Sequence, residues 1–142
     1  MDFVQARYVA VGDTQGELAP LANTNLVIVD NQPGEVALLD DTNLNTFDPE
    51  RFLYTGSDGT QFVLSVVDGV ESITDRNGNV VTFDDAGIHH SAGREVLFTR
   101  DVLGRITEIT DPEGETQTYT YDGRGNLVTH DDQEGARPRY RY

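Results

Sequence analysis

Several residue types that carry chemistry are missing from this chain of 142 residues. It contains no cysteine, no tryptophan and no lysine, so all 10 basic residues are arginines. Without cysteine there is no disulfide, no thiolate metal ligand and no thiol nucleophile. No run approaches the ~20 apolar residues of a membrane helix. The opening residues also lack the basic start and apolar stretch of a signal peptide.

Positive charge is scarce as well. The chain has 25 Asp and Glu against 10 basic residues, which gives a formal net charge of −15 at pH 7. Such a surface repels phosphates, which argues against nucleic acid and against insertion into an anionic membrane. The chain is 37% hydrophobic, enough to build a core, which separates it from disordered acidic tails. Its length predicts one domain or a piece of a longer one.

What the sequence has in abundance is one tetrapeptide, Asp-x-x-Gly. The Asp accepts a hydrogen bond from a backbone N–H two residues on and the Gly takes a positive φ, so the pattern predicts type I turns. The copies begin at Asp75, Asp84, Asp101, Asp111, Asp122 and Asp132 and end at Gly78, Gly87, Gly104, Gly114, Gly125 and Gly135. The segments between them are rich in β-branched and aromatic residues. From about residue 52 we therefore predict an all-β fold of short antiparallel hairpins.

The turns also form a longer repeat. Residues 98–106 (FTRDVLGRI) align with residues 119–127 (YTYDGRGNL) at a displacement of 21. Less regular units begin near residues 59 and 81, with turns expected at 68–69 and at 91–93. A fixed period of ~20 residues is typical of repeat architectures, in which each hairpin buries its apolar face on its neighbours.

Two motifs identify the repeat. The run Tyr119-x-Tyr121-Asp122-x-x-Gly125-Asn126-Leu127, preceded by Ile109-x-Asp111-Pro112-x-Gly114, resembles the YD repeat of Rhs proteins, insecticidal toxin-complex subunits, wall-associated proteins and teneurins. The resemblance covers about 59–142, so we divide the chain into YD-type repeats at 59–142 and a divergent β segment at 1–58, either upstream repeats or a cap. It implies a structural signature, with no catalytic, cofactor or metal site, at Asp101, Gly104, Asp111, Gly114, Tyr119, Tyr121, Asp122 and Gly125.

The resemblance also implies an architecture and a role. The hairpins would form part of a β spiral or shell, as a non-catalytic structural segment of a large secreted or cell-surface protein. Such shells enclose a toxic C-terminal payload or present an adhesive surface. The partners would be the rest of the same polypeptide, including adjacent repeats and an enclosed C-terminal domain, and beyond it glycans or surface proteins. The alternative is a carbohydrate- or protein-binding adhesion module assisted by calcium.

The last residues fit an interrupted unit. Tyr140 and Tyr142 stand 21 residues after Tyr119 and Tyr121. We therefore expect a third unit that is truncated, and a chain that is a piece of a longer polypeptide.

Residues 1–58 carry weaker signals. Residues 26–29 (LVIV) and 35–39 (EVALL) are continuously apolar and predict a hairpin that is covered on both faces. Another strand is expected within residues 3–11, and the polar stretch 40–49 is expected to be a loop.

The candidate metal ligands are explained by simpler roles. His89 and His90 are adjacent, so on a strand they point to opposite faces, and His130 is distant in sequence. The run Asp75-x-Asn77-x-Asn79 imitates the start of a calcium loop, but Ala86 stands where the bidentate Glu belongs. We expect turn formation to account for this run.

Catalytic motifs are not found either. The paired carboxylates at 40–41, 84–85 and 131–132 are expected to be solvated turn residues, and none of the four serines lies in Gly-x-Ser-x-Gly. The self-cleaving segment of Rhs shells contains Asp-Pro-x-Gly-Leu, whereas Asp111-Pro112-Glu113-Gly114 is followed by Glu115. An enzyme is therefore the third and weakest hypothesis.

Aromatic residues recur in columns at the 21-residue period: Phe98, Tyr119, Tyr121, Tyr140 and Tyr142. Packing across strands is favoured over a platform for sugar rings, because the period itself accounts for the placement of the aromatic residues. Arg100 and Arg105 flank Asp101 and are expected to offset the local negative charge.

Overall fold

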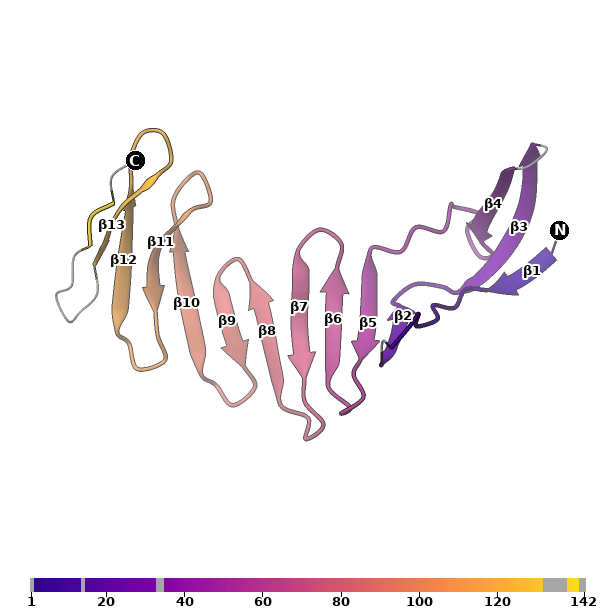
Figure 1. The fold of residues 1–142 in the computed structure, drawn as a ribbon, viewed down its shortest axis with the longest axis horizontal. Helices are drawn as coiled ribbons and strands as arrows, with labels where there is room; N and C mark the ends of the chain where they lie inside the picture. The colour runs from indigo at the N-terminus through magenta and orange to yellow at the C-terminus, as the bar shows by residue number, and fades with distance from the viewer. Residues whose placement is uncertain (1, 14, 33–34, 132–137, 141–142) are drawn as a thin grey trace. The chain divides into compact units, whose positions relative to one another are not determined.

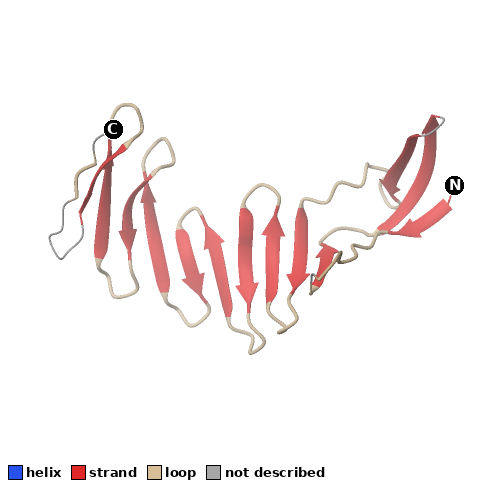
Figure 2. Cartoon of the chain, in the orientation of Figure 1, coloured by secondary structure: helices blue, strands red, loops and turns tan. Residues whose placement is uncertain are grey.

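The computed structural model describes residues 2–13, 15–32, 35–131 and 138–140 (Figure 1). In these ranges the chain consists of strands, turns and loops, which confirms the predicted all-β fold (Figure 2). No helix long and apolar enough to cross a membrane occurs in the part of the chain so described. The chain divides into two compact units, residues 1–80 and 81–142, which are considered separately.

The described residues form 13 strands, and the pairings given below are all antiparallel. The strands are β1 (Asp2–Gln5), β2 (Glu17–Pro20), β3 (Asn25–Gln32), β4 (Glu35–Asp40), β5 (Arg51–Thr55), β6 (Gln61–Ser65), β7 (Gly69–Thr74), β8 (Val80–Asp84), β9 (Gly87–His90), β10 (Glu95–Arg100), β11 (Ile106–Thr110), β12 (Thr116–Tyr121) and β13 (Leu127–Asp131).

The first unit begins with a three-stranded sheet in the order β1-β3-β4. Leu26 and Val27 in β3 are 1% and 2% exposed, and within the described residues they alone form a fully buried apolar core. Because neighbours on a strand point to opposite faces, both faces of β3 are covered there, as its continuously apolar sequence predicts. The same prediction is wrong for β4, because Val36 and Leu38 are 60% and 40% exposed and one face of that strand is open. The strand expected within residues 3–11 is shorter than predicted, since β1 ends at Gln5.

The first unit also contains the ladder β2-β5-β6-β7. Tyr54 lies opposite Phe62, with the ring centroids 5.9 Å apart, and its hydroxyl donates to the Gln15 carbonyl at 2.7 Å. A Cβ on Gly16 would lie 2.5 Å from that hydroxyl, so the close approach requires glycine. Strand β5 precedes the proposed boundary at residue 58 and β6 follows it, and that boundary stays a prediction.

The second unit is a ladder in which each strand from β8 to β13 pairs with the next along the chain. Its two faces differ in chemistry, because side chains opposite each other across strands share a face. One face carries Val81, Phe83, Ile88, Val96, Phe98, Ile109 and Tyr119. The other carries Thr82, Thr99, Thr110, Thr116, Thr118, Thr120 and Thr129.

The outer edge of β13 is partly occupied. Arg139 forms a β-bridge with Thr129, and the Tyr140 N–H donates to the Val128 carbonyl at 3.0 Å. The backbone thus returns to the edge after β13, and the antiparallel pairing continues there. The Asp132–Gly135 turn predicted between these segments lies outside the described residues.

Candidate functional site

Six hairpin turns within the described ranges share one hydrogen-bond pattern. In each, the N–H of the first residue donates to the carbonyl of the fifth, and the N–H of the fourth donates back to the carbonyl of the first, at 2.8–3.0 Å. The turns begin at Gly56, Asp75, His90, Asp101, Asp111 and Asp122. The fourth residue is a glycine every time, with φ between +78° and +89°. The predicted positive φ at Gly104, Gly114 and Gly125 is therefore confirmed.

The aspartates act through their carboxylates. Oδ1 of Asp101 accepts the N–H groups of Leu103 and Arg105, at 2.9 and 3.0 Å. Asp75, Asp111 and Asp122 accept the equivalent pair of N–H groups at 2.8–2.9 Å. These backbone N–H groups take the place of water as hydrogen-bond donors to the carboxylate where the chain turns. A short side chain that accepts two hydrogen bonds, such as Asp, therefore suits the first position of the turn.

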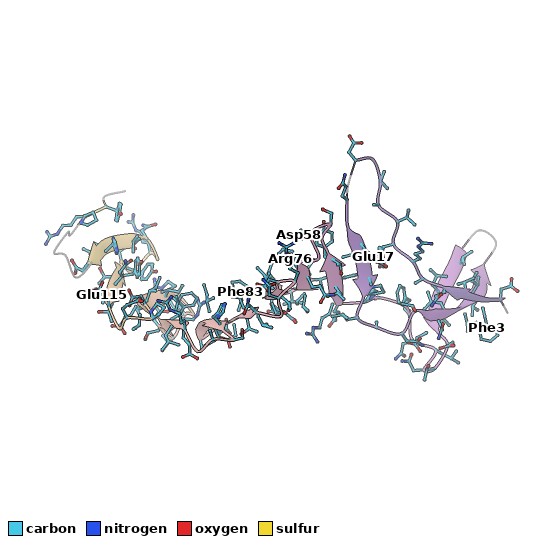
Figure 3. The ribbon with its side chains drawn as sticks, turned by 90° about the horizontal axis from the view of Figure 1, so that it is seen from below. Phe3, Glu17, Asp58, Arg76, Phe83 and Glu115 are labelled. Carbon is cyan, nitrogen blue, oxygen red and sulfur yellow. The ribbon has the colours of Figure 1, made fainter. Side chains whose placement is uncertain are left out.

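These contacts shift the acid–base equilibria of the turns. Hydrogen bonds to a carboxylate favour its charged form. The Arg105 side chain lowers the pKa of Asp101, and the Asn126 backbone N–H lowers the pKa of Asp122. In the first unit the pKa of Asp58 is lowered by the Thr60 N–H and, to a smaller extent, by the charge of Arg76 (Figure 3).

Two turns depart from the pattern. Asp84 pairs with Gly87 across a two-residue loop, so the predicted turn exists but is shorter than the others. Its Oδ1 accepts the N–H groups of Ala86 and Gly87 at 2.8 and 3.0 Å. The turn expected at 91–93 has the common pattern with His90 in the place of Asp, and Nδ1 of His90 accepts the Ala92 N–H at 3.0 Å.

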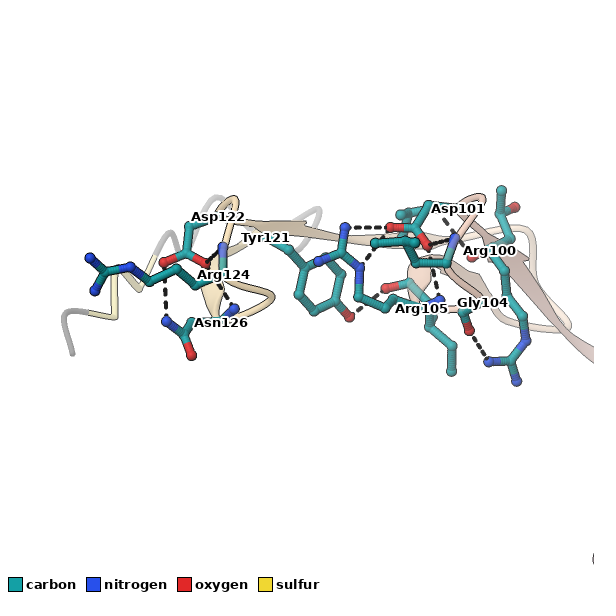
Figure 4. A network of polar contacts seen from close by, with 12 residues as sticks. Arg100, Asp101, Gly104, Arg105, Tyr121, Asp122, Arg124 and Asn126 are labelled. Carbon is teal, nitrogen blue, oxygen red and sulfur yellow. Dashed lines mark hydrogen bonds and ion pairs between the residues drawn. The ribbon is translucent and has the colours of Figure 1, made fainter.

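A signature tyrosine joins two successive hairpins (Figure 4). The Arg105 guanidinium lies 2.7 Å from Asp101 Oδ2 and 4.5 Å from the centroid of the Tyr121 ring. The Tyr121 hydroxyl donates to the Ile106 carbonyl at 2.6 Å. Arg105 therefore offsets the charge of Asp101 and supports the ring of the next hairpin at the same time.

Arg100 is held by backbone carbonyls of two different turns. Its guanidinium donates to the carbonyls of Asp85 and Gly104, at 2.9 and 2.8 Å. Arg100 follows a bulge between Thr99 and Arg100, where the register shifts. Such a bulge bends the strand and changes where its side chains point, here toward backbone acceptors.

Tyr119 packs on the neighbouring strand. It lies opposite His130, with ring centroids 5.0 Å apart and an interplanar angle of 14°. Its hydroxyl donates to Gln117 Oε1 at 3.1 Å. No sequence signal marks His130 as the stacking partner, because the repeat does not determine which residue lies opposite Tyr119.

The three histidines occupy separate surroundings. His89 lies between Asp84 and Glu95 on the threonine-bearing face, whereas His90 lines an open hollow of about 510 Å³ on the apolar face with Val81 and Val96. No group of three or more His, Asp or Glu side chains in the described residues is arranged to hold a metal ion. At the predicted calcium-like run, the two Asp75 carboxylate oxygens accept hydrogen bonds from Asn77 and Asn79, as a turn requires.

Comparison with known families matches one segment. The family model for the RHS repeat matches residues 100–137. No curated protein matches the chain. The described part of the matched segment contains three of the common turns, beginning at Asp101, Asp111 and Asp122, and the contact between Arg105 and Tyr121.

Proposed function

We propose that the hairpin ladder, which contains an RHS repeat matched over residues 100–137, is a wall segment of a large secreted or cell-surface protein. The segment is a structural repeat. In the proposal the wall encloses a C-terminal payload of the same polypeptide on its apolar side and presents the threonine-bearing side to solvent.

The observation that carries the proposal is the repetition of one turn geometry along a ladder in strict sequence order. The same pair of backbone hydrogen bonds closes the turns at Asp101, Asp111 and Asp122, and each strand they join pairs with the next. A sheet built by this rule lengthens by one hairpin per unit and has no internal limit. The pairing of Arg139 with β13 follows the same rule.

The difference in chemistry between the two faces of the second unit supports a wall with one covered face and one face open to solvent. Phe98, Ile109 and Tyr119 lie on one face, yet no large apolar side chain in the described part of this unit is fully buried. Covering exposed apolar surface is favourable, by roughly 25 cal/mol per Å² of area removed from water. The polar face needs no cover, because threonine hydroxyls are satisfied by water.

One observation favours the alternative, a carbohydrate-binding adhesion module. The stacked rings of Tyr119 and His130 lie beside the Gln117 amide, whose oxygen is 3.1 Å from the Tyr119 hydroxyl. Aromatic rings next to amides suit the apolar and polar faces of a sugar. Binding to a glycan array that Tyr119→Ala abolishes and Tyr121→Phe leaves intact would favour this alternative over a wall without ligands.

The absence of cysteine offers a clean test of the wall. Ile109→Cys places a thiol on the apolar face, and Thr110→Cys places a matched thiol one residue away on the other face. In the 142-residue chain both thiols should react at similar rates with a soluble maleimide. In the polypeptide encoded by the complete reading frame, with any other cysteines replaced, the thiol of the Ile109→Cys variant should be protected. The thiol of the Thr110→Cys variant should still react.

Two results would contradict the proposal that this ladder is a wall segment. One is equal labelling at both positions in the complete polypeptide. The other is a complete reading frame that encodes no further hairpin units and no segment for the wall to enclose.

A further inference from the structure

A histidine on the threonine-bearing face of the second unit meets a carboxylate at each of its ring nitrogens. His89 in β9 places Nδ1 3.2 Å from Glu95 Oε1, at the start of β10, and Nε2 3.3 Å from Asp84 Oδ1, at the end of β8. A neutral imidazole has one N–H and one lone pair, so it can donate only one of these hydrogen bonds. The imidazolium donates both.

The charged groups that face this imidazole are both acidic. Asp84 faces it from β8 and Glu95 from β10, and its other cross-strand neighbour, Thr82, is uncharged. The nearby arginines are engaged elsewhere: Arg94 pairs with a glutamate of the β11–β12 turn, and Arg100 donates to backbone carbonyls. The positive charge between the two carboxylates therefore comes from the proton on the ring.

We propose that Asp84, His89 and Glu95 form a proton-operated clasp across β8, β9 and β10, closed when the imidazole is charged and loosened when it is neutral. With the charged ring, the middle strand is tied to both neighbours through side chains. With the neutral ring, one carboxylate faces a lone pair and that tie is lost. Asp84 keeps the N–H groups of Ala86 and Gly87 in either state, so the turn itself survives the change.

The direction of the pH dependence follows from the same contacts. The hydrogen bond to Glu95, and then the one to Asp84, raise the pKa of His89 above its usual 6.5. The stabilisation is therefore fully present below pH 6.5 and is lost as pH rises through the raised folded-state value. On the acid side, the Ala86 N–H and lesser contacts lower the pKa of Asp84 below 3.8, so its contribution is lost only as pH falls through that lowered value. The clasp is strongest in mild acid.

The clasp can be measured in the intact chain by two readouts. NMR titration of the three histidine side chains, assigned with single His→Gln variants, reports the proton affinity of each ring. Hydrogen exchange, corrected for the intrinsic effect of pH, reports local opening of β8–β10 against β11–β12 as an internal reference. Each unit of pKa difference between the closed and open states corresponds to about a tenfold change in the local opening constant.

We expect His89 to titrate above 6.5 and the protection of β8–β10, but not of β11–β12, to fall as the ring loses its proton. His89→Gln should abolish this pH dependence, and Glu95→Gln should lower the pKa of His89 with the ring still present. His130→Gln, on the opposite face, is the control and should leave the pKa of His89 and the pH dependence of β8–β10 protection unchanged. Titration of His89 at or below 6.5, or a pH dependence that survives His89→Gln, would overturn the proposal.

Discussion

Alanine substitution at two glycines of one turn should change the free energy of unfolding in opposite directions. Gly125 has φ +89°, in the left-handed region, whereas Gly123, two residues earlier, lies outside that region. A Cβ on Gly125 would come no closer than 3.8 Å to the Arg105 side chain, and one on Gly123 would meet nothing within 4 Å. Steric contact is therefore not a factor at either position, and backbone conformation alone separates them.

The expected magnitudes follow from backbone preferences. Alanine in the left-handed conformation costs about 1–2 kcal/mol, so Gly125→Ala should lower the free energy of unfolding by that amount. Gly123→Ala should raise it by about 0.4–1 kcal/mol, because alanine restricts the unfolded chain and fits the folded one. The two variants should differ by about 1.5–3 kcal/mol.

Urea denaturation followed by far-UV circular dichroism measures this difference, as the chain has no tryptophan to serve as a fluorescent probe. An unchanged urea dependence in both variants would show that the effect is on stability and not on the extent of unfolding. If both variants were destabilised equally, or if Gly125→Ala were neutral, the left-handed glycine would not be what fixes this turn.

Three further predictions concern the same hairpins. His90→Asp should stabilise the chain to urea by about 0.5–1.5 kcal/mol, because a carboxylate there can accept a second backbone N–H; a destabilised variant would contradict this. Tyr121→Phe should cost about 0.5–1.5 kcal/mol through loss of the hydrogen bond to the Ile106 carbonyl, more than the control Tyr119→Phe, whose hydroxyl bonds a side chain of its own strand. The pKa of Asp122 is held below its usual 3.8 by the Asn126 N–H, so its contribution is present above pH 3.8 and is lost as pH falls through the lowered value. In urea titrations from neutral to acid pH, the deficit of Asp122→Asn should therefore shrink in acid, and a constant deficit would refute the assignment.

Much of the hairpin region could be predicted because its determinants are local. A type I turn closed by a glycine depends on four or five consecutive residues, and Asp111 with Gly114 contains all that is needed. The contacts that the sequence does not predict have non-local or register-dependent causes. Arg100 is adjacent to Asp101 in the sequence, but it follows a bulge at Thr99 and its guanidinium donates to the carbonyls of Asp85 and Gly104.

From about residue 52 the sequence by itself determined the hairpin strands, the turns that join them and the period of 21 residues, because alternation and turn chemistry act over a few residues. It also indicated that β3 is covered on both faces, but it wrongly indicated the same for β4. The tertiary structure alone decided which side chains meet across strands. Register places Tyr119 on His130 and sets His89 between two carboxylates from different strands. These contacts depend on how strands pair in space, and a single shift of register would exchange every one of them.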